Sequence, residues 1–232
     1  MINCIINTTI MFKKILIKIL SLFNEKIIDK YLFKIPLRDK SPYRTHLPVL
    51  CALEKIYKFK NILELGSGFY STQIFCDKKL FPNIRKITSY EDNYNWYKLI
   101  KNKIKKKKKL NLIYTKNKIE NIIRKINLEN YDLILVDNSN NALSRIKTIK
   151  HIIQKKILKP IIVIHDFEYY PYRLVSKKIS YQYRFKCLTP NTGILQNKKN
   201  YFKIKRLKKI DTKLRCFQNI NNNQFTSLLY KI

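Results

Sequence analysis

The stretch Asn61-Ile-Leu-Glu-Leu-Gly-Ser-Gly-Phe-Tyr-Ser-Thr72 predicts a short buried strand, a glycine turn and the start of a helix. Ser71 and Thr72 are residue types that favour a helix N-terminus. The chain has only three glycines in 232 residues, and two of them, Gly66 and Gly68, stand in this turn. Because glycine leaves the backbone uncovered by a side chain, the pair indicates close approach to a ligand that faces backbone N–H groups at a helix start.

Strand-like and helix-like segments alternate along most of the chain. Apolar runs predict strands at 62–65, 84–90, 111–115, 131–137 and 160–165. Apolar residues at helical spacing predict helices at 47–57, 71–80, 94–104, 118–126, 142–158 and 172–179. This alternation predicts βαβ units and an α/β fold with a parallel sheet, whose apolar strands are covered on both faces. Segments 181–188 and 193–196, which flank a Thr-Pro-Asn turn, predict the antiparallel element.

Three segments are distinguished by composition. An amphipathic helix with a proline-containing lead-in is predicted at 1–44, an α/β domain at 45–200 and a basic, asparagine-rich extension at 201–232. The pattern of 10–23 favours a helix that packs on the domain or is used in oligomerisation, and alternatively a peripheral membrane contact. Lysines interrupt this segment and follow its first apolar run, which argues against a transmembrane span and against a signal peptide.

The composition bears on compartment and partners. Five widely spaced cysteines without a C-x-x-C pair predict neither a disulfide framework nor a zinc ribbon, and a reducing, cytoplasmic location is expected. The formal net charge of +34 comes mostly from lysine, and nucleic acid is a candidate partner of such a chain. The abundance of lysine, isoleucine and asparagine also resembles the product of an AT-rich coding sequence, and compositional drift is the favoured explanation of the charge.

Polar residues gather at the expected carboxyl ends of the strands, where open parallel sheets bind ligands. They are Glu64 with Gly66, Ser67 and Gly68, Glu91 with Asp92, Thr115 with Asn117, Asp137 with Asn138, and His165 with Asp166. Glu91 lies 25 residues beyond Gly66, a spacing at which an acid accepts hydrogen bonds from the ribose of a dinucleotide or an S-adenosyl nucleoside. Ser71 stands where a dinucleotide fingerprint needs its third glycine, and the missing Walker lysine excludes a P-loop.

With these features the chain resembles the class I S-adenosylmethionine-dependent methyltransferases, most closely a small bacterial and viral branch with an E-L-G-S-G-x-x-S-T first motif. The matching segments, within residues 44–196, are Arg44-Thr-His-Leu-Pro-Val-Leu50, Leu63-Glu-Leu-Gly-Ser-Gly68 with Ser71-Thr72, Ile87-Thr-Ser-Tyr-Glu91 with Trp96-Tyr97, Leu135-Val-Asp137 with Arg145, and Ile164-His-Asp166. The resemblance implies a Rossmann-like fold, with helices on both faces of a mostly parallel seven-stranded sheet in the order 3-2-1-4-5-7-6. The segment 45–200 would then be the S-adenosylmethionine-binding domain.

The resemblance also implies roles for individual residues. The predicted cofactor-binding residues are Glu64, Gly66, Ser67, Gly68, Ser71, Thr72, Glu91 and Asp137. The first strand and its turn would hold the methionine portion, and Glu91 would bind the ribose hydroxyls. The chain near Thr115 to Lys118 would lie beside the adenine. Asp137 would face the methionine amine or the substrate, and His165 and Asp166 would line the substrate pocket.

Methyl transfer from a sulfonium requires an aligned acceptor and removal of the acceptor's proton. We expect a hydroxyl acceptor on a small molecule or sugar, with His165 as catalytic base and Asp166 assisting it. No metal site is predicted, although Asp137, His165 and Asp166 could alternatively gather a divalent cation. The alternative functions are an RNA methyltransferase and a non-catalytic nucleic-acid-binding protein on the same scaffold. Trp96 also fits plain core, and His46 fits a local contact at a helix start.

Overall fold

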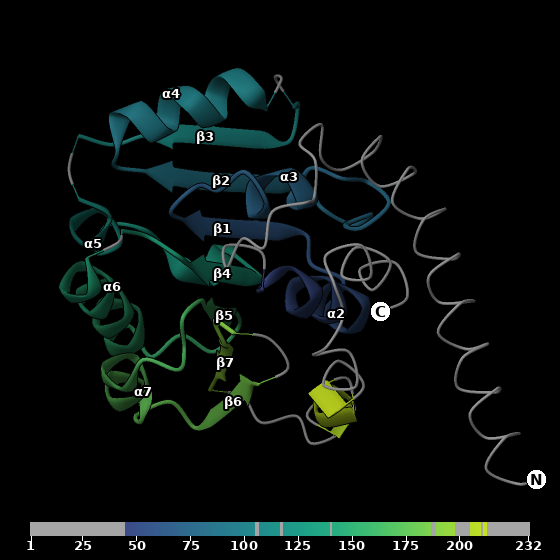
Figure 1. The fold of residues 1–232 in the computed structure, drawn as a ribbon, viewed down its shortest axis with the longest axis vertical. Coiled ribbons are helices and arrows are strands. Elements are labelled where there is room, and N and C mark those ends of the chain that lie inside the picture. The colour runs from purple at the N-terminus through teal and green to yellow at the C-terminus, as the bar shows by residue number, and fades with distance from the viewer. Residues whose placement is uncertain are drawn as a thin grey trace, which may run out of the picture.

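Seven strands form one mixed sheet in the computed structural model, which describes residues 45–104, 107–116, 118–139, 141–186, 189–197, 205–209 and 211–212. The strands are β1 (Asn61–Leu65), β2 (Lys86–Glu91), β3 (Leu110–Tyr114), β4 (Leu133–Val136), β5 (Ile161–Ile164), β6 (Tyr181–Phe185) and β7 (Thr192–Gln196). Their order is β3-β2-β1-β4-β5-β7-β6, as Figure 1 shows. The strands β1 to β5 are parallel, and β7 runs antiparallel to β5 and β6. The predicted fold class and strand order are confirmed.

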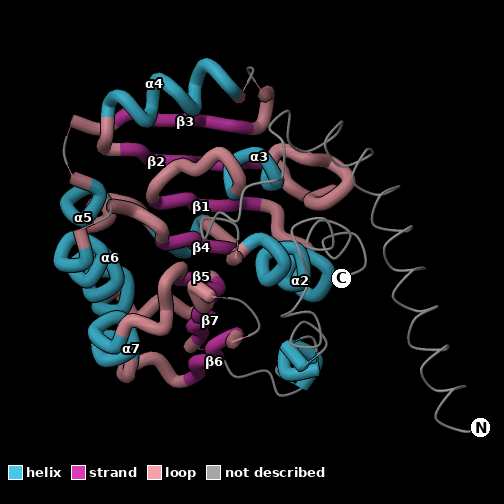
Figure 2. The backbone as a smooth tube through the Cα atoms, in the orientation of Figure 1, coloured by secondary structure: helices cyan, strands magenta, loops and turns pink. Residues whose placement is uncertain are grey.

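Helices connect the strands, as the alternating pattern predicts. They are α2 (Leu47–Tyr57), α3 (Ser71–Phe75), α4 (Tyr94–Lys103), α5 (Ile119–Ile122), α6 (Ala142–Gln154) and α7 (Tyr170–Ser176), with a short 3-10 helix at Leu128–Asn130. Figure 2 shows the helices and loops that link successive strands of the sheet. The parallel part is therefore built from βαβ crossovers, which place the carboxyl ends of the strands at one edge of the sheet.

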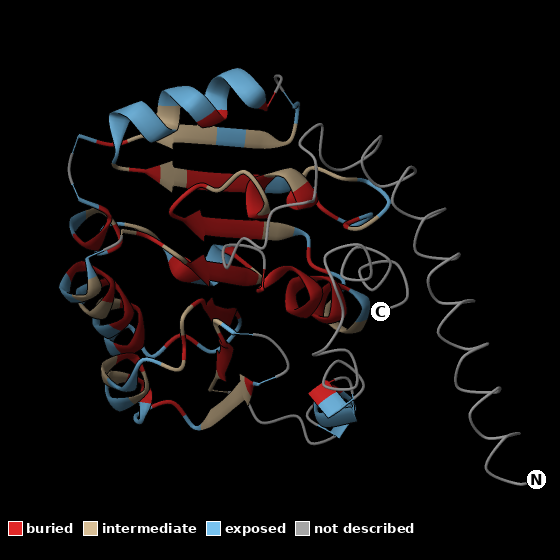
Figure 3. Ribbon diagram, viewed as in Figure 1, coloured by how far each residue is buried: buried red, intermediate tan, exposed pale blue. Residues whose placement is uncertain are grey.

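Two apolar clusters cover the two faces of the sheet. One joins α2 and α3 to residues of β1, β2, β4 and β5, and the other joins α5, α6 and α7 to the alternate residues of the central strands. Adjacent residues Ile62 and Leu63 of β1 belong to opposite clusters, because successive side chains of a strand point to opposite faces. Figure 3 shows the burial concentrated in the central strands, whereas α4 at the β3 edge is largely exposed.

Four helices end three or more residues earlier than their sequence patterns predict, namely α3, α5, α6 and α7. The local structure shows how α3 and α6 end. The predicted helix 71–80 ends at Phe75, because the carboxylate of Asp77 accepts hydrogen bonds from the backbone N–H groups of Lys79 and Leu80 and holds a turn. The predicted helix 142–158 ends at Gln154, and Lys156 adopts the left-handed backbone region at φ 50°. In both cases the apolar pattern continues past the helix, since Leu80 and Ile157 still pack on the core.

Part of the predicted C-terminal extension packs on the domain. Residues 205–209 and 211–212 are helical, Leu207 belongs to the core, and the Tyr183 hydroxyl donates to Asp211 at 2.8 Å. The amphipathic segment within 1–44 lies outside the described residues, as does the end of the extension, where the sequence of 225–230 also fits a helix. Among the residues that are described, none of the helices has the length and apolar character to cross a membrane.

Candidate active site

A cavity of about 780 Å³ opens at the carboxyl ends of β1, β2, β4 and β5. Strand-end loops and the helix starts that follow them supply most of its wall. The lining residues are His46, Gly66, Ser67, Gly68, Phe69, Tyr70, Ser71, Glu91, Asp92, Asn93, Trp96, Asp137, Ser139, Asn141, Arg145, His165, Asp166 and Pro190. This is the position at which an open parallel sheet binds its ligand.

The glycine turn brings bare backbone to the cavity. Gly66 has φ +90°, a conformation that side chains disfavour, and its N–H donates to the carbonyl of Tyr90 at 2.9 Å. The Gly68 N–H donates to the Thr72 hydroxyl at 3.0 Å, which joins the turn to the first turn of α3. The turn is thus fixed between β1 and α3 with its backbone against the cavity.

Glu64 lies behind this turn and not on the cavity wall. Its carboxylate is fully buried and accepts hydrogen bonds from the hydroxyls of Thr72 at 2.7 Å and Ser89 at 2.5 Å. Burial raises the pKa of Glu64 to about 7, even though hydroxyl groups oppose that shift. Neither Glu64 nor Thr72 lines the cavity, so the structure places both as supports of the turn from behind.

Glu91, at the end of β2, does line the cavity, and its hydrogen bonds to Ser67 connect the end of β2 to the turn after β1. One oxygen accepts from both the backbone N–H and the hydroxyl of Ser67, each at 3.1 Å, and the other accepts from the Asn93 N–H at 2.8 Å. Burial is the largest influence on Glu91 and raises its pKa, against the effect of these hydrogen bonds. A ligand that reaches the glycine turn therefore also meets the Glu91 carboxylate.

Trp96 contributes an aromatic wall beside the same turn. Its indole N–H donates to the Ser67 carbonyl at 2.7 Å, and its ring packs edge-on against Phe69 with centroids 4.7 Å apart. The side chain is 38% exposed and lines the cavity, so the plain-core interpretation of Trp96 does not describe it. A flat aromatic surface at this place could stack on a heterocyclic base.

Arg145 links the carboxylates at the ends of β4 and β5. The guanidinium is almost fully buried and pairs with Asp137 at 3.0 Å and with Asp166 at 2.7 Å. It also donates to the backbone carbonyls of Asn138 at 3.0 Å and Ser139 at 3.1 Å. Such a fork of charged hydrogen bonds fixes the two carboxylates relative to each other.

His165 is held between hydroxyl and carboxylate groups. Its Nδ1 lies 3.3 Å from Asp137 and 3.5 Å from Asp166, and its Nε2 lies 3.1 Å from the Thr45 hydroxyl. That hydroxyl donates its single proton to the carbonyl of Pro190 at 2.7 Å, so it can only accept from Nε2. Both ring nitrogens of His165 therefore act as donors, as in an imidazolium.

The electrostatic surroundings agree with this protonation state. Burial disfavours the charged ring, but the charge and hydrogen bond of Asp137, together with Asp166, outweigh it and raise the pKa of His165. Burial likewise opposes the Asp137 carboxylate, yet His165 and Arg145 lower the pKa of Asp137 to about 2. The neighbouring carboxylates therefore favour the protonated form of the His165 ring.

Most of the predicted site residues meet in the cavity. Those on its wall are Gly66, Ser67, Gly68, Ser71, Glu91, Asp137, His165 and Asp166. Near the predicted adenine side, Lys116 and Lys118 line a smaller cavity that shares four wall residues with the main one. Sequence reasoning assigned no role to Arg145 and missed His46 as a wall residue. The pattern around Arg145 offered one signal, because it stands on the helix that follows the acidic end of β4.

The charge of the cavity is opposite to that of the chain. Four of the 15 acidic residues line it, and Arg145 is the sole lysine or arginine on its described wall. Those four are Glu91, Asp92, Asp137 and Asp166. A wall rich in carboxylates in a protein of net charge +34 favours a cationic ligand and disfavours phosphate groups.

Comparisons with known proteins identify the fold. No family model matches the chain, and no curated protein matches its sequence. A candidate caffeoyl-CoA O-methyltransferase from Staphylococcus aureus is similar in structure, with TM-score 0.51, 16% identity, and coverage of 79% of this chain and 98% of that one. Human methyltransferase-like protein 13, bound to S-adenosylhomocysteine, has TM-score 0.51 at 13% identity, over 75% of this chain and 93% of that one.

An O-methyltransferase from Bacillus cereus, also bound to S-adenosylhomocysteine, has TM-score 0.50 at 14% identity, over 73% of this chain and 94% of that one. At this level of identity the likeness concerns the fold. The seven-stranded sheet and its order are therefore those of methyltransferases with a Rossmann-like fold.

Proposed function

We propose that the protein is an S-adenosylmethionine-dependent methyltransferase. The observation that carries the proposal is the acidic cavity at the strand ends of a methyltransferase-type fold. S-adenosylmethionine brings a sulfonium and an ammonium group and no phosphate, so the four carboxylates of the wall suit it better than a dinucleotide or a triphosphate. The structural neighbours bound to S-adenosylhomocysteine support the same choice of cofactor.

Within this proposal the wall residues divide between the parts of the cofactor. The bare backbone from Gly66 to Gly68 would receive the methionine portion, with Glu64 and Thr72 fixing the turn from behind. Glu91 would accept hydrogen bonds from the ribose hydroxyls, since a carboxylate oxygen can accept more than one. Trp96 would contact the adenosyl group, and Asp137 would face the methionine amine or the acceptor.

The acceptor is proposed to be a hydroxyl of a small molecule or a sugar. The methyl group would pass from sulfur to the acceptor oxygen, the oxygen would lose its proton, and the sulfonium would leave as a neutral thioether. His165 and Asp166 line the cavity beside Asp137 and remain the proposed residues for the acceptor side. Because the neighbouring carboxylates raise the pKa of His165, its activity as a base would increase with pH.

Cofactor binding is expected to stabilise the fold. At a free concentration 100 times the dissociation constant, S-adenosylmethionine or S-adenosylhomocysteine should raise the free energy of unfolding by about 2.7 kcal/mol. A thermal-shift series on the full chain measures this, with ATP and NAD as controls that should give no shift at the same concentration. The absence of a shift with millimolar S-adenosyl ligand would overturn the proposal.

Replacing Glu91 by glutamine is expected to weaken S-adenosylhomocysteine binding about tenfold or more. Hydrogen bonds to a charged group contribute about 1.5–3 kcal/mol, and about 1.4 kcal/mol corresponds to a factor of ten in affinity. Isothermal titration measures the effect, and Asp92→Asn is the matched control, because it removes an equal charge from the neighbouring wall residue. If both variants lost the same affinity for S-adenosylhomocysteine, Glu91 would contribute only its negative charge and not specific hydrogen bonds.

A further inference from the structure

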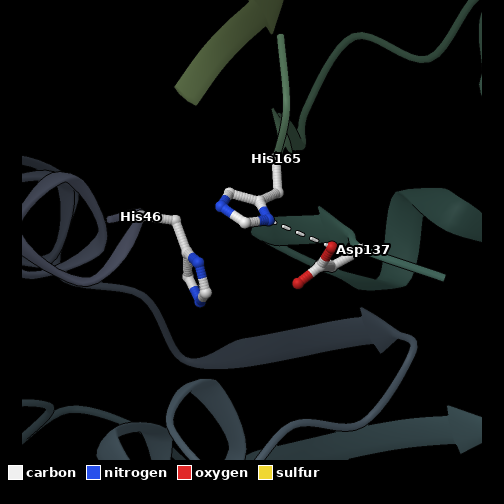
Figure 4. A group of neighbouring side chains, drawn as sticks. All are labelled: His46, Asp137 and His165. Atoms are coloured by element: carbon white, nitrogen blue, oxygen red, sulfur yellow. Dashed lines mark hydrogen bonds and ion pairs between the residues drawn. The ribbon is translucent and has the colours of Figure 1, made fainter. Parts of the chain in front are cut away.

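Two histidines and an aspartate converge on one point of the cavity wall. His46 stands directly before α2, Asp137 directly after β4 and His165 directly after β5. One side-chain nitrogen or oxygen from each residue lies within 4.8 Å of the other two. Figure 4 shows the two rings and the carboxylate facing a common space, with the His165 ring hydrogen-bonded to Asp137. Each of the three also lines the cavity, so the point is open to a ligand.

His46 is the least expected of the three. The ring is only 2% exposed, and neither of its nitrogens has a hydrogen-bond partner among the described residues. Buried side-chain nitrogens nearly always have a hydrogen-bond partner, so a ring without a protein partner that lines a cavity is placed to bind a ligand. Burial and, next, the charge of His165 lower the pKa of His46 to about 3, so the ring is neutral and keeps a free lone pair. A neutral imidazole is the form that binds metal ions.

The surroundings of His165 and Asp137 have the form of an outer layer around a metal site. The Nε2 of His165 donates to the Thr45 hydroxyl, whose own proton goes to the Pro190 carbonyl. This hydrogen bond leaves Nδ1 as the nitrogen that faces Asp137. Metal-binding histidines usually donate from their second nitrogen in this way, and binding carboxylates are held by further partners, as Arg145 holds Asp137.

The charge balance leaves room for a cation. Asp137 and Asp166 together carry two negative charges, and Arg145, which pairs with both, supplies one positive charge. The ring of His165 lies beside both carboxylates, with Nδ1 3.3 Å from Asp137 and 3.5 Å from Asp166. A divalent ion bound next to Asp137 would supply the positive charge that Arg145 alone does not.

We propose that His46, His165 and Asp137 bind a divalent transition-metal ion in this cavity. Two imidazoles and one carboxylate suit zinc, iron or cobalt, whereas magnesium prefers an oxygen-rich, octahedral set. Ligands about 2.1 Å from an ion lie at most about 4.2 Å apart, so a small inward rotation of the side chains closes the site. With three protein ligands the ion keeps open positions toward the cavity, where an acceptor oxygen could bind.

Metal binding can be measured without the cofactor, and its outcome is therefore independent of the proposed methyltransferase activity. The full chain is stripped with a chelator and titrated with Zn²⁺ calorimetrically. We expect one Zn²⁺ ion to bind tightly to each chain, and a large excess of Mg²⁺ should not displace it. His46→Ala should lower the affinity about 100-fold or more, since even loss of an outer partner costs about 10–100-fold. The control is His151→Ala, whose half-buried ring lies on α6 outside the cavity wall and contacts Arg124.

A second measurement, on protein that keeps His46, covers the case in which His46→Ala does not fold. Pulsed electron paramagnetic resonance of the Cu²⁺-loaded protein should show two coordinated imidazoles. The chain has only three histidines, so in a His151→Ala background that signature can arise only from His46 and His165. Failure to bind Zn²⁺, unchanged affinity in a folded His46→Ala variant, or fewer than two coordinated imidazoles would overturn the proposal.

Discussion

Replacing Gly66 by alanine is expected to cost about 2–6 kcal/mol of folding free energy, which approaches the whole stability of an ordinary domain. Two effects combine at this residue. Its φ of +90° is strained for any residue with a Cβ, and an added Cβ would lie 2.5 Å from the Asp137 carbonyl and 2.7 Å from the Asn138 nitrogen. Those are backbone atoms of the loop after β4, so no side-chain rotation relieves the contact.

The neighbouring glycine provides the control for this prediction. A Cβ at Gly68 would meet only the Ser71 hydroxyl at 2.8 Å, and the backbone there is not in the positive-φ region. Since a serine side chain can rotate, Gly68→Ala should cost far less than Gly66→Ala. Urea unfolding of both variants followed by circular dichroism measures the difference. Comparable midpoints for the two variants would show that the turn relaxes more easily than its packing indicates.

The fold was predictable because several independent signals agree. The near-continuous apolar runs of β1, β4 and β5 indicate strands buried on both faces, and the glycine-poor chain concentrates two glycines where β1 meets α3. The helix ends were harder, because they depend on competing local bonds. The Asp77 carboxylate ends α3 through two backbone N–H groups although the apolar pattern runs on to Leu80.

The site was predictable only as far as topology determines it. Once the strands are parallel, their polar ends must meet at one edge, which brings Glu91, Asp137 and His165 to one cavity. The sequence could not show that His46, 119 positions before His165, packs against its ring with centroids 4.7 Å apart. Nor could it show that Thr45 and Pro190 complete the hydrogen bonds of His165, because those contacts depend on the packing of α2 against the sheet.

Arg145→Met is expected to destabilise the protein by about 3–5 kcal/mol. Methionine approximately fills the volume but leaves Asp137 and Asp166 without their shared cation, and breaking a buried ion pair on one side costs about that much. The two backbone carbonyls at Asn138 and Ser139 also lose their donors. Guanidinium unfolding at neutral pH measures the loss, and Arg124→Met, at an exposed arginine, should change stability by no more than about 1 kcal/mol.

The effect of Arg145→Met should depend on pH in a definite direction. His165 and Arg145 lower the pKa of Asp137 to about 2 against the effect of burial, so the carboxylate stabilises the native state above its ordinary pKa near 3.8 and loses that contribution as the pH falls toward 2. The variant lacks part of this contribution. The difference in unfolding free energy between wild type and variant should therefore be largest near neutral pH and narrow below about pH 4. A difference that stays constant from pH 7 to pH 3 would mean that Arg145 acts through packing and its carbonyl contacts, and not through the Asp137 charge.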